Sequence, residues 1–188
     1  MVALAIFAGL FVVLTAGTSV AQATGVPAEI QAELLSKLAS YDRNFSQRAG
    51  DVARVLLVTK RDSAKSQLAA EEMKSALGRL ERIGGLPHQE TLVPFESADA
   101  LAARCRAERV AAVYLTPGFD DDLARLRDAF AGVNVLTLAD VPEYVPEGVV
   151  LGFGLEAGKP KVLINLDQAK RQNVDFPADV LRLMKVYR

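Results

Sequence analysis

Short, nearly unbroken runs of aliphatic and β-branched residues alternate along the chain with longer segments in which apolar residues recur every three or four positions. The short runs are typical of strands buried on both faces of a parallel sheet, and the periodic segments are typical of amphipathic helices. Strands are therefore predicted at residues 52–59, 89–95, 110–115 and 133–138, with residues 52–59 (VARVLLVT) as the central strand.

Helices are predicted before and between these strands, beginning at Pro27, Ser63, Ser97 and Asp120. The apolar face of the first helix consists of Ile30, Leu34, Leu38 and Tyr41. The second helix is long, extends to Ile83 and ends at Gly84-Gly85, because glycine is the common residue at helix C-termini. Strands that alternate with helices of this length imply right-handed crossovers and a mostly parallel sheet.

The C-terminal part of the chain has a different pattern. Apolar runs at residues 149–155 and 161–166 lie on either side of the turn sequence Glu156-Ala157-Gly158-Lys159, which predicts an antiparallel hairpin at one edge of the sheet. Asp167 is placed to cap a following helix, and Pro177 to begin a last amphipathic helix that buries Val180, Leu181 and Met184. The predicted fold class is a three-layer α/β sandwich of about six strands, with helices on both faces.

The N-terminal segment is predicted to be a signal peptide. The first charged residue is Glu29, residues 2–14 form an apolar core, and Ala21-Gln22-Ala23 supplies small residues for cleavage. An uncleaved membrane anchor is the alternative, but polar residues and glycines leave fewer than the roughly 20 apolar residues that a span needs. The expected organisation is a cleaved signal peptide, residues 1–23, and a single domain, residues 24–188, in the periplasm.

Composition excludes some classes of partner. The chain has 22 basic and 23 acidic residues among 188, a net charge of −1, so no overall field attracts nucleic acid. Cys105 is the only cysteine, so no intrachain disulfide forms even in an oxidising compartment. Half of the residues are hydrophobic, enough for a core that holds the fold unaided.

One candidate binding site lies at the carboxyl ends of the predicted parallel strands, where open α/β sheets usually bind ligands. Lys60, Arg61 and Thr116 follow two of these strands and are the candidates for a small anionic ligand. The alternative is that Asp62 or Ser63 only caps the next helix, with solvated basic neighbours.

A second candidate surface is the segment Tyr41, Asp42, Arg43 and Asn44 before the first strand. It combines an aromatic ring, a carboxylate, a guanidinium and an amide, and Arg43 could pair with Asp42 or with an external carboxylate or phosphate. The alternative is a locally satisfied turn, because Asp and Asn commonly close turns through their own backbone.

Other residues with reactive side chains do not assemble into a site. Asp120, Asp121 and Asp122 begin a helix and complement its dipole more readily than they bind a cation. His88 has no nucleophile motif around it, and Cys105 lies on an apolar helix face. The glycines of residues 152–158 lie within the hairpin and do not form a dinucleotide loop. We expect no catalytic residue, no metal and no cofactor.

The C-terminal sequence resembles that of the YfiR-like family of exported bacterial proteins. The similarity lies in the hairpin ending in Ile164-Asn165-Leu166, the helix with Ala169 after it, and Val180-Leu181-Arg182-Leu183 followed by Lys185-Val186. A leading helix and a Val/Leu-rich first strand extend it over most of the predicted mature chain.

The resemblance implies a periplasmic α/β protein, often a homodimer, that regulates a membrane-bound signalling protein. In the best-known member the target is a diguanylate cyclase, whose repression lowers cyclic-di-GMP. This chain lacks the disulfide cysteines of that member, and residues 41–44 differ from its tryptophan-containing segment. We therefore expect a non-enzymatic regulator of a cyclase or receptor kinase. The alternative is a small-molecule-binding domain that resembles one lobe of a solute-binding protein.

Overall fold

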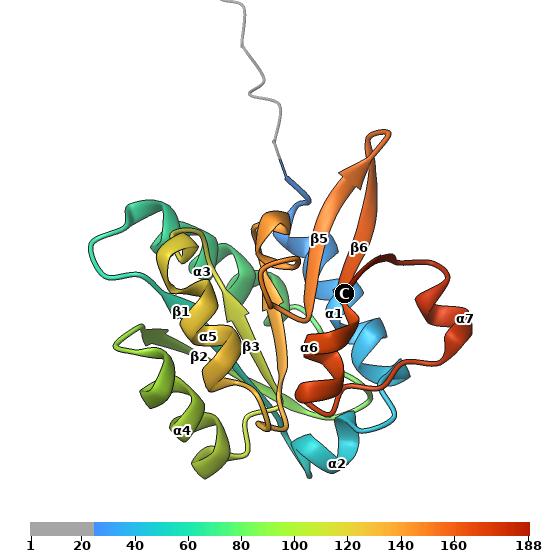
Figure 1. Ribbon diagram of the computed structural model, residues 1–188, viewed down its shortest axis with the longest axis horizontal. Helices are drawn as coiled ribbons and strands as arrows, with labels where there is room; N and C mark the ends of the chain where they lie inside the picture. The colour runs from blue at the N-terminus through green and yellow to red at the C-terminus, as the bar shows by residue number, and fades with distance from the viewer. Residues whose placement is uncertain (1–24) are drawn as a thin grey trace, which may run out of the picture.

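The computed structural model describes residues 25–188, so the predicted signal peptide lies outside the described residues. A single sheet crosses the molecule, with strand order β2-β1-β3-β4-β5-β6-β7, and helices pack on both of its faces (Figure 1). The strands are β1 (Ala53–Thr59), β2 (His88–Pro94), β3 (Ala112–Leu115), β4 (Leu136–Ala139), β5 (Leu151–Glu156), β6 (Lys159–Asn165) and β7 (Lys185–Tyr187). The predicted α/β fold class is confirmed.

Seven α-helices and two short 3-10 helices connect these strands within residues 25–188. The α-helices are α1 (Ala28–Tyr41), α2 (Phe45–Ala49), α3 (Ala64–Leu77), α4 (Ala98–Glu108), α5 (Leu123–Ala129), α6 (Leu166–Arg171) and α7 (Ala178–Leu181). The 3-10 helices are η1 (Asp120–Asp122) and η2 (Pro142–Tyr144).

Strands β1 to β5 pair with one another in parallel, and the β5–β6 hairpin is antiparallel as predicted. The sheet has seven strands instead of about six, since β7 pairs in parallel with β6. The prediction that residues 52–59 form the central strand is wrong, because β1 lies second from one edge and β4 is in the middle. A strand buried on both faces is apolar wherever it lies inside a sheet, so hydrophobicity alone does not give strand order.

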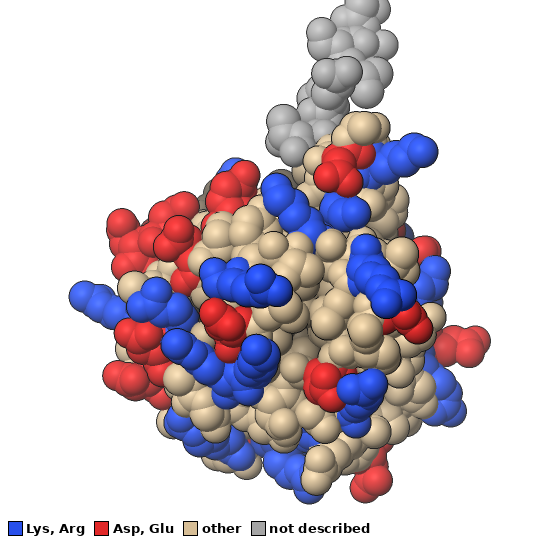
Figure 2. All heavy atoms as spheres, turned by 45° about the vertical axis from the view of Figure 1, so that its right-hand side comes forward, with Lys and Arg blue, Asp and Glu red and all other residues tan. Residues whose placement is uncertain are grey.

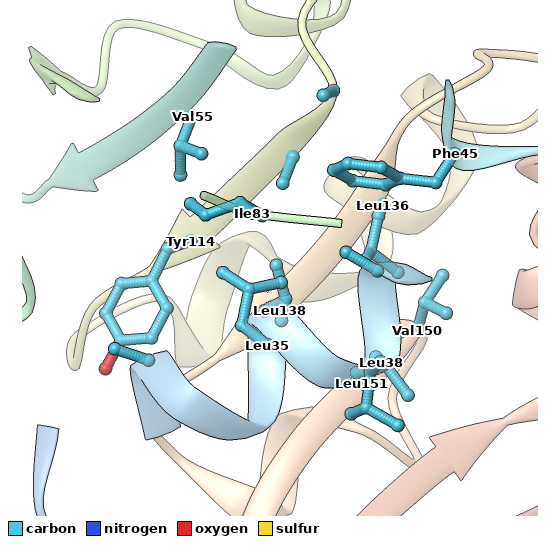
Figure 3. Packing of buried hydrophobic residues seen from close by; sticks show 14 of the residues in the cluster. Leu35, Leu38, Phe45, Val55, Ile83, Tyr114, Leu136, Leu138, Val150 and Leu151 are labelled. Carbon is cyan, nitrogen blue, oxygen red and sulfur yellow. The ribbon is translucent and has the colours of Figure 1, made fainter. Parts of the chain in front are cut away.

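Successive side chains of β1 alternate between two apolar cores, one on each face of the sheet. Val55 and Leu57 face the core that α1, α3 and the C-terminal segment cover, whereas Leu56 and Val58 face the core under α4 and α5. Figure 3 shows the first core, in which Leu35 of α1 lies beside Leu138 of β4. The three-layer arrangement follows directly from this alternation.

The predicted apolar face of α1 is only partly right. Leu38 is buried, but Ile30 and Tyr41 are exposed, and the buried face also includes Gln31 and Leu35. Gln31 is buried because its amide donates to the Val26 carbonyl at 2.8 Å and to Asp140 at 2.9 Å. A polar residue satisfied in this way does not contribute to the apolar periodicity that predicts the buried face.

Helix α3 ends at Leu77, six residues before the predicted end. Its C-cap is Gly78, whereas Gly84 and Gly85 lie in the following loop with φ of 57° and 81°. Gly84 has another role: a Cβ atom there would lie 2.7 Å from the Phe45 ring, so only glycine lets the loop pack against α2.

The C-terminal part also differs from the prediction in detail. Asn165, and not Asp167, caps α6, since its side chain accepts from the Gln168 amide at 2.9 Å. The last helix is a single turn, and the three residues of β7 after it return to the sheet. A three-residue strand is too short to show an alternating pattern, so the sequence did not predict it.

Candidate functional site

The predicted surface at residues 41–44 is the turn that joins α1 to α2. Asp42 is buried there and forms an ion pair with Arg48, with 2.8 Å between Oδ2 and Nη1. The other oxygen of Asp42 accepts hydrogen bonds from the backbone amides of Asn44 and Asp175. Asp42 therefore stabilises the turn itself and is enclosed by its neighbours.

Arg48 is buried like Asp42, and its guanidinium donates to three groups. Besides Asp42, it donates from Nε to Asn134 Oδ1 at 2.9 Å and from Nη2 to the Asn173 carbonyl at 3.0 Å. Burial lowers the pKa of Arg48, and the adjacent Asp42 carboxylate opposes that change. The pair fixes α2 against the segments that precede β4 and follow α6.

The remaining residues of this predicted surface lie closer to solvent. Arg43 is exposed and pairs with Asp175 at 2.9 Å, not with Asp42, and Asn44 donates to the Asn173 carbonyl at 3.0 Å. Tyr41 is exposed at the end of α1. The turn thus fastens the segment that leads into α7, and only Tyr41 and Arg43 offer side chains to a partner.

The second predicted site lies at the carboxyl ends of β1 and β3. Thr116 is completely buried and donates to the Val58 carbonyl at 2.8 Å. The Ser66 hydroxyl bridges Thr116 and the backbone amide of Lys60, so the structure brings Lys60 and Thr116 close together. Arg61 is exposed beside them.

Residues that the sequence did not single out surround the Lys60 ammonium group. It pairs with Asp122 and lies 4.9 Å and 5.1 Å from the ring centres of Phe95 and Phe119. The charge of Lys60 is therefore already balanced inside the protein, and an anionic ligand at this site would compete with Asp122. Asp122 was predicted to complement a helix dipole, and no local pattern indicates its pairing with a lysine 62 positions away.

Arginine side chains from separate parts of the chain line a cavity of about 530 Å³ that is open to solvent and that the sequence did not predict; two of them, Arg106 and Arg109, are exposed. They are Arg48 of α2, Arg106 of α4 and Arg109 directly after α4, with Asn134 and Asn173 beside them. Arg106 and Arg109 are three positions apart, which is an observable signal in the sequence. Only the fold, however, brings Arg48 and Asn134 to the same place.

The side of the sheet formed by β5, β6 and β7 carries exposed apolar side chains. Leu155 of β5, Leu183 after α7 and Val186 of β7 are among the large hydrophobic residues with the highest exposure, and Leu183 is 72% exposed. We call these three exposed residues, one on β5, one in the connection before β7 and one on β7, the C-terminal apolar patch. A hollow of about 850 Å³ is lined by Leu155, Lys161, Lys185 and Tyr187 among others, and Val186, between the last two along β7, does not line it.

Charges of both signs are interspersed over the face that Figure 2 shows, and Lys and Arg side chains gather along its lower edge. In residues 25–188 no group of three His, Cys, Asp or Glu side chains is arranged to hold a metal ion. His88 contacts Glu90 and the Leu80 carbonyl, and burial raises the pKa of the Cys105 thiol to about 12. His88 is thus held by hydrogen bonds, and Cys105 is a buried residue in the wall of the arginine-lined cavity. None of the helices within residues 25–188 has the length and apolarity required to cross a membrane.

Comparison with known protein families identifies one match. A family model described as YfiR/HmsC-like matches residues 28–185. A comparison with curated protein sequences finds no match.

Several solved structures share the fold. They include a conserved domain protein from Vibrio cholerae (TM-score 0.59, 14% identity, 86% of this chain and 60% of that chain). An ABC domain from Streptococcus pneumonia in complex with L-Trp has a TM-score of 0.58 at 14% identity, with 86% and 62% of the two chains covered. The ligand-free, open structure of a substrate binding protein with adhesive properties from Clostridium difficile has a TM-score of 0.62 at 10% identity, with 87% and 60% covered. This chain thus spans only about three fifths of the length of each, and at these identities the similarity concerns the fold alone.

Proposed function

The chain belongs to the YfiR/HmsC-like family, and we propose that it is a non-enzymatic regulatory protein of the periplasm that binds the exported part of a membrane signalling protein. The observation that carries this proposal is the family match over residues 28–185, which takes in nearly all of the described chain. The partner that we propose is a diguanylate cyclase or a receptor kinase, and the regulation is repression.

The C-terminal apolar patch is the surface that we assign to this partner. Leu183 lies in the short connection between α7 and β7 and buries little of its side chain against the domain. These leucine and valine side chains expose apolar surface to water, which is unfavourable. A partner that covers this surface removes it from water and is stabilised on the protein. These residues therefore offer exposed apolar side chains of the kind that the centre of a protein interface buries.

Backbone groups beside this patch are also open to a partner. β7 is the outermost strand and has only β6 as a neighbour, so its other side carries unpaired backbone groups in the described chain. The first half of β6 extends beyond β7 but contains Lys159, Pro160 and Lys161, residues that discourage strand addition. A partner strand would thus be directed to β7, next to Val186.

The test is in-cell cross-linking of the tagged chain, followed by purification from detergent-solubilised membranes and mass spectrometry. We expect recovery of a membrane protein with a cyclase or kinase domain, cross-linked to residues near Leu183. Deleting the gene should raise cyclic-di-GMP if the partner is a repressed cyclase. Recovery of no signalling protein above an untagged control, at several salt concentrations, would contradict the proposal.

A second candidate function is small-molecule binding, and the similar solved structures favour it. Two of them are described as a substrate binding protein and as a domain in complex with L-Trp. A thermal-shift screen of small metabolites separates the two functions, since a ligand at a hundred times its dissociation constant stabilises the folded state by about 2.7 kcal/mol. A regulator that acts only through protein contacts gives no such shift.

A further inference from the structure

The arginine-lined cavity lies at the amino ends of three neighbouring parallel strands. Lys60 and Thr116 lie at the other, carboxyl, ends of these strands. Arg48 precedes β1, Arg109 precedes β3 and Asn134 precedes β4. Because β1, β3 and β4 are parallel neighbours, they begin at the same end of the sheet, and these three residues lie together there. The volume of about 530 Å³ is within the range of small-molecule pockets in proteins.

The charge of this cavity is not balanced by its own walls. Its lining contains three arginines and no carboxylate. Arg48 is paired with Asp42, but Arg106 and Arg109 form no ion pair within residues 25–188. Glu108, the nearest carboxylate in sequence, is paired with Arg104 at 3.0 Å. Two uncompensated guanidinium groups therefore face one cavity.

These two guanidinium groups also have unused donors. Arg109 donates from Nη2 to the Gln47 carbonyl at 3.2 Å, and Arg106 from Nη2 to the Ala129 carbonyl at 3.5 Å. A guanidinium carries five N–H donors, so most donors of each group remain for another acceptor. Arginine forks match the oxygens of a carboxylate or a phosphate two at a time.

The protein holds two of the three cavity arginines, Arg109 and Arg48, in place. Arg109 follows α4 in the left-handed conformation, with φ of 51°, and its guanidinium lies against Gly50, where a Cβ atom would be 3.4 Å from Nη2. Arg48 is fixed by its bonds to Asp42, Asn134 and Asn173. The Oδ1 atom of Asn134 is thereby engaged. A site whose donors are already positioned loses less conformational entropy when a ligand binds.

We propose that this cavity binds a small molecule through an oxyanion group, a phosphate or a carboxylate, held by Arg106 and Arg109. The site lies away from the C-terminal apolar patch. A failure of this cavity to bind a ligand would therefore leave the proposed partner binding untouched. Phosphate and carboxylate both present negatively charged oxygens to the arginines, and the titration below distinguishes them.

The test is isothermal titration of the purified chain with three probes at constant ionic strength: inorganic phosphate, succinate and sodium chloride. We expect saturable binding of phosphate, of succinate or of both, and none of chloride. Binding of phosphate alone identifies a phosphate group as the ligand feature, and binding of succinate alone identifies a carboxylate. Saturable binding of neither probe overturns the proposal.

Variants connect the binding to the residues. We expect Arg106→Gln and Arg109→Gln each to weaken binding about tenfold, because each removes a charged hydrogen-bond donor. Arg82→Gln is the matched control, since Arg82 is an exposed arginine that donates to the Gly85 carbonyl and does not line the cavity. Circular dichroism verifies that the variants are folded. Equal affinity of the wild type and the Arg106 and Arg109 variants would overturn the assignment.

Discussion

Asp42 and Arg48 are the charged residues whose environment is most constrained by the fold, because both side chains are almost completely removed from water. The sequence predicted that Asp42 lies in a functional surface or a satisfied turn. The structure places it in a turn that is satisfied by the local Asn44 amide and also by two groups outside the turn, the Arg48 side chain and the Asp175 amide. Sequence reasoning identified the unusual composition of this turn but could not identify partners that only tertiary packing supplies. Binding by the exposed Tyr41 and Arg43 stays a prediction.

The Asp42→Ala variant tests the buried pair. Removing the carboxylate leaves the Arg48 charge buried without a counter-charge, which typically costs about 3–5 kcal/mol of unfolding free energy. Asp175→Ala is the control, since it removes the carboxylate of the exposed pair with Arg43, for which we expect a loss of about 0–1 kcal/mol. Urea unfolding measures both values. Equal losses in the two variants would contradict the assignment of Asp42 as the structural residue.

Cys105 was predicted to be a buried, inert thiol, and it lies on the buried face of α4. Its raised pKa of about 12 has burial as the main cause, with Glu108 adding to it. The raised value means that the folded state favours the protonated thiol. The contribution to stability is therefore present below the ordinary thiol pKa and is lost as pH rises toward 12.

Thiol labelling measures this protection. At pH 8 we expect a thiol-specific reagent to react with the folded chain about a thousandfold more slowly than with the chain in urea, because only the thiolate is nucleophilic. Rapid labelling without urea would show that the thiol is accessible and ionised, contrary to its position in the structure.

Among the elements, the loop between α3 and β2 shows how a glycine pair can mislead a sequence-based prediction. Gly84-Gly85 was predicted to end a long helix, but the helix ends earlier at Gly78. The glycines serve packing and backbone conformation instead, since Gly84 lies directly against the Phe45 ring of α2. A helix end and a close approach between elements require the same residue type, so the sequence does not distinguish them.

The variants Gly84→Ala and Gly85→Ala separate these two requirements. Both glycines have positive φ, but a Cβ atom meets the Phe45 ring only at residue 84 and meets nothing within 4 Å at residue 85. We expect both variants to lose about 1 kcal/mol for backbone strain and Gly84→Ala to lose about 1–3 kcal/mol more for overpacking. Thermal unfolding gives the difference. Equal losses would mean that α2 does not pack against this loop.

The hairpin and the last elements show the limit of periodicity. The strands of the β5–β6 hairpin were predicted because each is long enough to show an apolar pattern. The single-turn helix α7 and the three-residue strand β7 are too short for any period to be recognised. Only pairing with β6 defines β7, and that pairing is not visible in the sequence of residues 185–187 alone.

For the whole molecule, the alternation of patterns was sufficient to predict a three-layer α/β sandwich, because buried strands and amphipathic helices each carry their own period. It was not sufficient to give the position of β1 in the sheet or the arginine cavity. Both depend on which elements are neighbours in space. The homodimer that the resemblance implies stays a prediction.

We expect the chain to bind a membrane signalling protein through the C-terminal apolar patch. The most informative variant is Leu183→Asp, since this residue is 72% exposed and its replacement should not disturb the core. The matched control is Leu68→Asp, because Leu68 is a 60% exposed leucine of α3. Helix α3 packs over β1 and β2, on the side of the sheet away from β7. Both changes place the same charge on the surface.

The decisive comparison is the amount of signalling protein that co-purifies with each form of the tagged chain from solubilised membranes, quantified by mass spectrometry. We expect Leu183→Asp to reduce recovery at least about tenfold and Leu68→Asp to leave it within about twofold of the wild type, because a buried apolar contact at an interface centre is worth more than 1 kcal/mol. Equal recovery with Leu183→Asp and wild type, or an equal loss in both variants, would contradict the proposed binding surface.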